Sequence, residues 1–310
     1  MRDDVTLHTV EVPAGETIGY RHRPGDVPVV LVHGNMTSSK HWDLVLESMD
    51  DDFDLYAVDL RGFGESSYRE PVGAIDDFAA DVAGVVDAVG LDRFHLVGWS
   101  AGGAVAMQVA ADLPERVHRL VLLAPASTRG YPVYRKDETG QPTDEPLTTR
   151  EEIRRDPVQV APVLEAYEDC DAETLKGIWN RLIYVNDRPD PDRYDDYVAD
   201  MCTQRNLVDV DYALAHFNVS TEHNGIEPGS GAVDRIEAPA LVLRGEDDLV
   251  VSRAMVEQTV ADLGDCAELR HLPGCGHSPL VDDLDRFLEH VEGFLRGPGD
   301  GEGEGEGEGT

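Results

Sequence analysis

Hydrophobic residues in the first 125 positions of the chain alternate between two spacings. Short apolar runs, several of them rich in β-branched residues, predict strands. These runs are residues 3–12, 17–22, 29–32, 54–58, 93–97 and 119–123. Helical spacing with many alanines predicts three helices between them, at residues 38–49, 75–89 and 101–111. The run at 29–32 is apolar throughout, as in a strand buried on both faces of a parallel sheet. The alternation predicts an α/β fold.

Residues 126–235 follow a different pattern. Strand runs vanish there, and helical patterns separated by Pro and Asp replace them. The clearest apolar stripe at helical spacing consists of Leu175, Ile178, Trp179, Leu182 and Ile183. Weaker helical candidates are residues 194–201 and 207–217. The strand and helix alternation then resumes, with strands at 240–243 and 266–272 and helices at 252–263 and 284–295.

An inserted helical block of this kind predicts a cap over an α/β core. We therefore expect a first core part at 1–125, a helical cap (lid) insertion at 126–235 and a second core part at 236–297. Residues 298–310 form a low-complexity acidic Gly/Glu tail, which we expect to be disordered. At 41% hydrophobic residues the chain can bury a sizeable core. It has no apolar stretch of about 18 residues, so we expect no membrane span.

The charge balance is strongly acidic. There are 62 Asp and Glu residues against 26 Lys and Arg, which gives a formal net charge of -36. Such self-repulsion destabilises a compact state in dilute buffer, whereas molar salt screens it within about 3 Å. The pattern is similar to that of proteins from salt-in halophiles, so we expect a halophilic archaeal source; an ordinary acidic cytosolic protein is the alternative. Without a basic patch to meet phosphates, nucleic-acid binding is disfavoured.

The ends of the chain and its cysteines indicate a cellular location. The N-terminus has acidic residues where a signal peptide would be basic, and no apolar segment follows, so we expect a cytoplasmic protein. Its four cysteines are Cys170, Cys202, Cys266 and Cys275. They lack the spacing of a zinc site or of a dense disulfide framework and suit a reducing cytoplasm, although one bridge remains open.

The strongest chemical signal is Gly98-Trp99-Ser100-Ala101-Gly102, directly after a predicted strand and at the start of a small-residue helix. A serine on such a tight turn is pushed out of the carboxyl edge of the sheet. The flanking glycines are needed because a Cβ there would clash with the neighbouring helix or strand. Ser100 is therefore a candidate nucleophile; the alternative is a glycine-rich turn with an idle serine.

Three further motifs follow predicted strands in a fixed order. They are His33-Gly34-Asn35, the segment 59–66 with the sequence DLRGFGES, and Gly276-His277-Ser278-Pro279. Together with the turn at Ser100, they make the chain resemble the α/β-hydrolase superfamily from about residue 5 to 296. The resemblance implies a mostly parallel eight-stranded sheet, flanked by helices and carrying an inserted cap, and a serine hydrolase.

A serine hydroxyl needs a base to attack a carbonyl, and the base needs an acid to hold its tautomer. His277, in a glycine-rich loop before the last helix, is the candidate base. In the α/β-hydrolase superfamily, which the chain resembles, the acid lies three residues after a glycine that follows a strand. This offset from Gly245 selects Asp248, and Asp247 and Glu246 remain as alternatives if the offset differs. The order Ser, Asp, His is the one that this fold uses. A dyad of Cys275 with His277 is disfavoured, because close neighbours in sequence rarely face each other.

An oxyanion hole needs two preorganised donors. The backbone N–H of Ala101 is one, and that of Asn35 is the expected second, with Met36 as its alternative. Trp99 and Asn35 together resemble the halide-holding pair of dehalogenases in this superfamily. Those relatives, like epoxide hydrolases, attack with aspartate, so Ser100 argues against both activities.

Trp99, Met36 and Trp179 are candidate pocket residues, with simple cap-to-core packing as the alternative for Trp179. We interpret His33 and the segment 59–66 as structural. No metal cluster, dinucleotide fingerprint or phosphate loop has convincing spacing, so we expect no cofactor.

The predicted function is hydrolysis of a small or medium carboxylic ester through an acyl-enzyme. A lactonase, thioesterase, amidase or C–C bond hydrolase remains an alternative, as does a ligand-binding or signalling protein with little turnover. The Gly-Gly-Pro-Gly loop of proline iminopeptidases is absent after His33. The expected partner is a small acyl substrate, with neither nucleic acid nor membrane, and the oligomeric state is left open.

Overall fold

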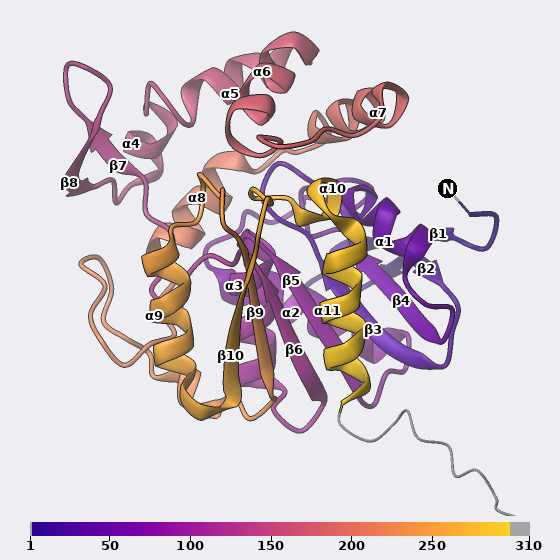
Figure 1. Ribbon diagram of the computed structural model, residues 1–310. Helices are drawn as coiled ribbons and strands as arrows, with labels where there is room; N and C mark the ends of the chain where they lie inside the picture. The colour runs from indigo at the N-terminus through magenta and orange to yellow at the C-terminus, as the bar shows by residue number, and fades with distance from the viewer. Residues whose placement is uncertain (1, 298–310) are drawn as a thin grey trace, which may run out of the picture.

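A computed structural model describes residues 2–297; the predicted disordered tail lies outside the described residues. Its centre is a twisted sheet of eight strands in the order β1-β2-β4-β3-β5-β6-β9-β10 (Figure 1). The strands are β1 (Thr6–Glu11), β2 (Thr17–Arg23), β3 (Val27–Val32), β4 (Phe53–Val58), β5 (Phe94–Trp99), β6 (Val117–Leu123), β9 (Ala240–Gly245) and β10 (Ala267–Leu272). Within this sheet the β1–β2 and β2–β4 pairs are antiparallel, and the other pairs are parallel. The predicted fold class is therefore confirmed.

Helices cover both faces of this sheet (Figure 1). Those packed on one face are α2 (Ile75–Ala88), α3 (Ala101–Asp112) and α9 (Arg253–Leu263), with the short helix η2 (Ala232–Arg235). Those packed on the other are α1 (Asp43–Ser48), α10 (Pro279–Asp282) and α11 (Leu284–Arg296), with η1 (Ser39–Trp42) leading into α1. The short turn η3 (Gly264–Cys266) joins α9 to β10. Two hydrophobic layers result, one on each side of the sheet.

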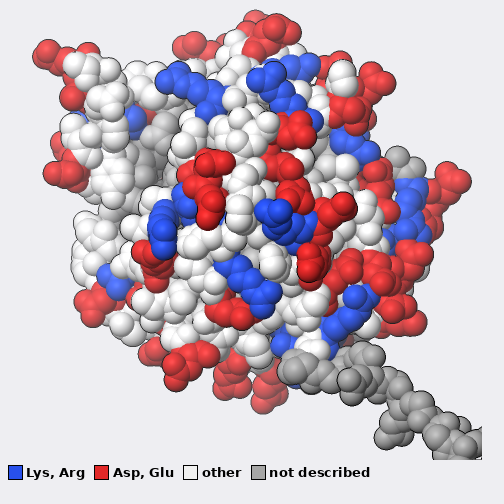
Figure 2. Space-filling model, in the orientation of Figure 1, with Lys and Arg blue, Asp and Glu red and all other residues white. Residues whose placement is uncertain are grey.

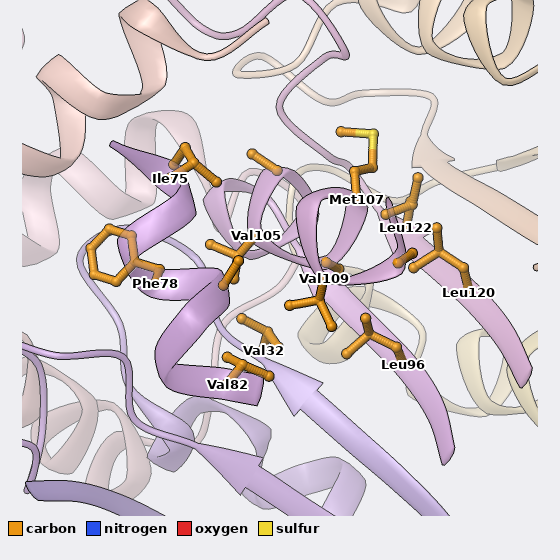
Figure 3. Packing of buried hydrophobic residues seen from close by; sticks show 14 of the residues in the cluster. Val32, Ile75, Phe78, Val82, Leu96, Val105, Met107, Val109, Leu120 and Leu122 are labelled. Atoms are coloured by element: carbon orange, nitrogen blue, oxygen red, sulfur yellow. The ribbon is translucent and has the colours of Figure 1, made fainter. Parts of the chain in front are cut away.

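Strand β3 shows why an apolar run predicts a buried strand. Val30 and Val32 belong to the layer under α2 and α3, whereas Val29 and Leu31 belong to the layer under α1 and α11. Figure 3 shows the first layer, where Val32 lies among side chains of α2, α3 and the neighbouring strands. Burying one such side chain stabilises the fold by about 1.5–3 kcal/mol, so both faces of β3 need apolar residues.

The segment between β6 and β9 leaves the sheet and lies over one end of it (Figure 1). Its helices are α4 (Arg150–Arg154), α5 (Ala161–Glu168), α6 (Ala172–Leu182), α7 (Pro191–Met201) and α8 (Leu207–His216). It meets the loops after β3 and β4, because Ser38 Oγ donates to Asp200 at 2.8 Å and the Arg205 N–H donates to Gly62 O at 2.9 Å. These contacts put the segment at the carboxyl edge of the parallel strands.

Two features of this segment differ from, or add to, the sequence analysis. The expectation of no strands between residues 126 and 235 was wrong, since β7 (Tyr134–Lys136) and β8 (Pro142–Pro146) form an antiparallel hairpin. The hairpin is short, mostly polar and exposed, so it leaves no apolar run to find.

A disulfide also joins Cys170, after α5, to Cys202, after α7, with 5.6 Å between the Cα atoms. This is the single bridge that the sequence left open.

Within the described residues, none of the helices combines the length and the apolar character needed to cross a bilayer.

A buried ion pair fixes the loop after β4. The Arg61 guanidinium donates through Nε and Nη2 to the Asp81 carboxylate on α2, with 2.6 Å from Nη2 to Oδ1, and both side chains are buried. The Arg61 carbonyl accepts from Asn206 Nδ2 at 2.7 Å, just before α8. The pair therefore joins the core to the segment above it.

We expect Asp81→Ala to lower the free energy of unfolding by about 3–5 kcal/mol, because the Arg61 charge stays buried without its partner. Asp87→Ala on the same helix is the control. It removes an exposed pair with Arg116 and should cost no more than about 1 kcal/mol. Chemical denaturation followed by circular dichroism measures both, and equal losses would contradict the assignment.

Candidate active site

Ser100 lies on a strained turn between β5 and α3. Its φ is +55°, a conformation that non-glycine residues rarely adopt, and it is held there by two backbone hydrogen bonds. The Ser100 N–H donates to Leu123 O at 3.0 Å, and the Ser100 carbonyl accepts from Ala126 N at 2.9 Å. The turn therefore presents a partly exposed serine hydroxyl at the carboxyl edge of the sheet.

The glycines around Ser100 permit close backbone approach. A Cβ on Gly98 would lie 2.3 Å from the Gly102 carbonyl oxygen, and one on Gly102 would lie 2.3 Å from the Val32 carbonyl oxygen. A Cβ on Gly34 would lie 3.0 Å from the Ser100 Cβ. Larger residues would push β3, β5 and α3 apart. The strand register puts Val32 beside Gly98, so the loop after β3 reaches Ser100.

His277 and Asp248 come together in the loops after β10 and β9. These strands are parallel neighbours, with Leu272 opposite Gly245. His277 Nδ1 lies 3.0 Å from Asp248 Oδ2, and both side chains are buried. The two register alternatives, Asp247 and Glu246, are exposed. The structure thus brings the predicted acid, and neither alternative, to the predicted base.

The Asp248 carboxylate is held by backbone donors as well. Its Oδ1 accepts from Val250 N at 2.8 Å and from Val251 N at 2.9 Å. Burial by itself raises the pKa of Asp248, but the neighbouring His277 and these hydrogen bonds outweigh it and hold the pKa below its usual value. Asp248 therefore stays ionised near neutral pH and can fix the tautomer of His277.

Trp99 anchors the His277 loop next to the serine. Its indole N–H donates to the His277 carbonyl oxygen at 3.0 Å, and the two rings lie 5.8 Å apart between centroids. Within the described residues the hydrogen bonds of His277 run to Asp248 and Trp99, and Ser100 is not among its partners. In resting enzymes the nucleophile–base contact is often long and tightens when substrate binds.

Two backbone donors belong to the turn at Ser100 and to the loop after β3 that reaches it. Within residues 2–297, the N–H groups of Ala101 and Asn35 have no hydrogen-bond acceptor. Met36, the alternative to Asn35, has its N–H engaged, because it donates to Asn35 Oδ1 at 3.0 Å. The geometry therefore leaves the two preferred donors available.

The side chain of Asn35 connects the site to the segment above it. Its Oδ1 also accepts from Gln204 Nε2 at 2.8 Å, and its Nδ2 donates to Asp211 Oδ1 at 3.1 Å. Gln204 Oε1 in turn accepts from the Tyr167 hydroxyl at 2.9 Å. Sequence reasoning missed Gln204, Asp211 and Tyr167, since each belongs to a segment without a recognisable motif and their meeting depends on how that segment packs.

The other predicted residues occupy structural positions. Trp99 is buried and turned towards the His277 loop, and Met36 lies partly exposed beside Asn35 with φ +59°. Trp179 packs on His41 and Tyr184, with 5.5 and 5.1 Å between ring centroids. The contact with His41 joins the segment between β6 and β9 to the core, whereas the contact with Tyr184 lies within that segment. Cys275 is buried, and burial raises its pKa to about 11, which makes it a poor nucleophile.

Two motif residues near the site hold loops in place. His33 Nε2 accepts from the Leu60 N–H at 3.0 Å, and burial lowers the pKa of His33 to about 4, so the ring is neutral. Asp59 accepts from the N–H groups of Ser39 at 2.7 Å and Glu65 at 3.0 Å. Across the described part of the chain, no group of three or more His, Cys, Asp or Glu side chains is arranged to hold a metal ion.

Comparison with known proteins agrees with this fold. A family model described as the alpha/beta hydrolase fold matches residues 27–284. The chain belongs to the α/β-hydrolase fold family. The family match includes Ser100, Asp248 and His277, and it spans the whole segment between β6 and β9.

Two curated members of the family align with nearly the whole chain. The 2-hydroxy-6-oxononadienedioate/2-hydroxy-6-oxononatrienedioate hydrolase of Burkholderia vietnamiensis is 29% identical and covers 88% of each chain. The pimeloyl-(acyl-carrier protein) methyl ester esterase of Nitrosospira multiformis is 27% identical and covers 91% of this chain and 100% of its own. Among solved structures, the esterase RhEst1 from Rhodococcus has a TM-score of 0.70 at 24% identity, covering 94% of this chain and 98% of its own. At that identity the structural likeness shows the fold alone.

We expect Trp99→Phe to lower kcat for p-nitrophenyl butyrate about tenfold with KM nearly unchanged, because one buried hydrogen bond that positions His277 is lost. The control is Trp42→Phe. Trp42 is equally buried, packs edge-on against Trp99, and its indole N–H has no acceptor among the described residues. Steady-state kinetics across pH compares the two variants, and equal losses in both would point to packing instead of positioning.

Proposed function

We propose that this protein is a serine hydrolase that cleaves small or medium carboxylic esters through an acyl-enzyme intermediate. The observation that carries the proposal is the placement of Ser100. It lies at positive φ at the sheet edge, next to Trp99, which binds the loop of the buried His277–Asp248 pair, and within residues 2–297 the N–H groups of Ala101 and Asn35 have no acceptor. This combination supplies a nucleophile, a base with its orienting acid, and oxyanion donors.

In the proposed mechanism, the Ser100 oxygen attacks the ester carbonyl carbon while His277 Nε2 takes the hydroxyl proton. The N–H groups of Asn35 and Ala101 hold the oxygen of the tetrahedral intermediate. As the C–O bond to the alcohol breaks, His277 returns the proton to the leaving oxygen, and an acyl-Ser100 ester remains. Water, deprotonated by His277, then attacks the acyl carbon. As the bond from that carbon to Ser100 Oγ breaks, His277 returns the proton to Oγ, which releases the acid and the free serine. The residues complete this cycle with an acyl substrate and water alone.

The names of relatives support ester substrates. One curated relative is a methyl ester esterase, and solved structures with the same fold include several esterases. A second candidate is hydrolysis of a 2-hydroxy-6-oxo dienedioate, the substrate in the name of the Burkholderia relative. Trp99, Met36 and Trp179 remain candidate pocket residues, and residues 126–235 the candidate cap. Trp99 and Met36 adjoin Ser100 and Asn35 in sequence, and Trp179 belongs to the segment that lies over the carboxyl edge of the sheet. A ligand-binding protein with the same fold would bind these molecules with negligible multiple turnover.

We expect Ser100→Ala to lower kcat for short-chain p-nitrophenyl esters at least about 10³-fold, because the covalent route is lost. The rate is measured in molar KCl from the absorbance of the released nitrophenolate. Ser48→Ala, an exposed serine at the end of α1, is the control and should keep the wild-type rate. Equal rates for wild type and Ser100→Ala, with both folded by circular dichroism, would refute the serine mechanism.

We also propose that the protein works in the cytoplasm of a salt-accumulating organism, and that a halophilic archaeon is its source. The formal net charge is -36, and Figure 2 shows acidic side chains across the visible face with basic ones interspersed. Many of the basic groups are already engaged in ion pairs, for example Arg193 with Glu47 and Arg129 with Asp262. The Cys170–Cys202 disulfide is less usual in a reducing cytoplasm and is the observation that weighs against this location.

If the acidic surface is adapted to salt, the free energy of unfolding should rise steadily from dilute buffer to molar KCl, because screening shortens the range of repulsion from about 10 Å at 0.1 M to about 3 Å at 1 M. Urea denaturation at each KCl concentration measures this. Sucrose at matched osmolality is the control, since it does not screen charge. An unchanged or falling stability in KCl would contradict the proposal.

A further inference from the structure

One carboxyl group near the reaction centre has no part in the proposed triad. Asp211, on α8, points towards the loop that carries the proposed oxyanion donor, and its Oδ1 accepts from Asn35 Nδ2 at 3.1 Å. Asp211 therefore lies one side chain away from the backbone N–H that would hold the substrate oxygen. Burial, together with the charges of Asp248 and Asp211, raises the pKa of Tyr131.

Asp211 is only partly exposed to solvent. Protein surrounds the carboxyl, and this burial, with the nearby charge of Asp156, raises the pKa of Asp211 to about 7. No basic side chain within the described residues lowers it. The residue nevertheless keeps partial solvent exposure, as Ser100 and Asn35 do. Within the described residues its Oδ2 accepts no hydrogen bond, and it is not among the polar atoms cut off from solvent, so it is the oxygen left for a ligand.

Chemistry restricts what can occupy that space. A substrate carboxylate there would face Asp211 without a compensating cation, and like charges in a poorly solvated site repel strongly. An apolar group would leave the carboxyl desolvated and without a new hydrogen bond. A hydroxyl group satisfies Asp211 in both protonation states, since it can donate to the carboxylate and accept from the acid.

We propose that Asp211 is a specificity-determining residue that selects esters bearing a hydroxyl group a few bonds from the scissile carbonyl and rejects esters bearing a carboxylate. This inference rests on the proposed function and adds a substrate class to it. It also separates this chain from its Burkholderia relative, whose named substrate is a dicarboxylate.

The test compares three p-nitrophenyl esters of similar size: butyrate, 3-hydroxybutyrate and the hydrogen succinate, which carries the carboxylate. Wild-type protein should prefer 3-hydroxybutyrate to butyrate, and butyrate to succinate. Asp211→Leu should lower the ratio of kcat/KM for 3-hydroxybutyrate over butyrate at least about tenfold, because it removes a hydrogen bond to a charged or acidic group. Asp211→Asn, which removes the charge alone, should raise the relative rate with succinate at least about tenfold.

The matched control is Asp209→Asn on the same helix. It removes the same charge, but Asp209 instead accepts from Arg150 Nε at 2.6 Å and from the Tyr68 hydroxyl. The substrate ratios of this variant should equal those of the wild type. If Asp211→Leu lowers the rates of all three esters by one common factor, Asp211 merely supports Asn35 and the inference is overturned.

A binding measurement keeps this inference distinct from the proposed function. Saturation-transfer NMR in the Ser100→Ala background compares methyl 3-hydroxybutyrate with methyl butyrate, with and without Asp211→Leu. A preference for the hydroxy ester that Asp211→Leu abolishes sustains the inference even where wild-type protein turns over no ester. Ser100-dependent turnover without any such preference overturns the inference and leaves the esterase proposal standing.

Discussion

The close approach of β3, β5 and α3 at the carboxyl edge of the sheet constrains every part of the candidate site. Because Gly98 and Gly102 lack a Cβ, the backbones come near enough for the chain to turn through Ser100 at φ +55°. That turn sets the direction of the serine hydroxyl, opens the N–H of Ala101 at the start of α3, and brings the Asn35 loop alongside. Strain at this one residue is tolerated because the buried layers on both faces of the sheet fix its neighbours.

The remaining groups reach the same edge by strand pairing. The parallel register of β9 and β10 carries Asp248 and His277 together, and Trp99 ties the His277 loop back to the serine turn. The core thus holds the proposed triad, whereas the segment between β6 and β9 adds Asp211 and Gln204 around Asn35. Under the proposed function, the attacking groups belong to the sheet and the selectivity to the inserted segment, which is how one fold can serve many substrates.

Most of the fold, and the candidate residues Ser100, Asp248 and His277, could be predicted from local sequence patterns and from the resemblance to a known family. The strand at 29–32 is recognisable because both its faces are buried, and Ser100, Asp248 and His277 stand at fixed offsets from glycines that follow strands. The β7–β8 hairpin left no signal, since its exposed residues are polar. Asp211 is one of 62 acidic residues, and its hydrogen bond with Asn35 depends on how α8 packs against the loop after β3. The pairing of Cys170 with Cys202, 32 positions apart, likewise depends on how α5 and α7 meet.

The central claim is that Ser100 is an activated nucleophile. Reaction of the folded protein in molar KCl with a fluorophosphonate probe, followed by peptide mass spectrometry, tests it without assuming any substrate. The account predicts one phosphonyl group per chain, attached to Ser100, and no labelling of Ser100→Ala. Absence of labelling in the folded wild-type protein, or attachment to a different residue, would contradict it.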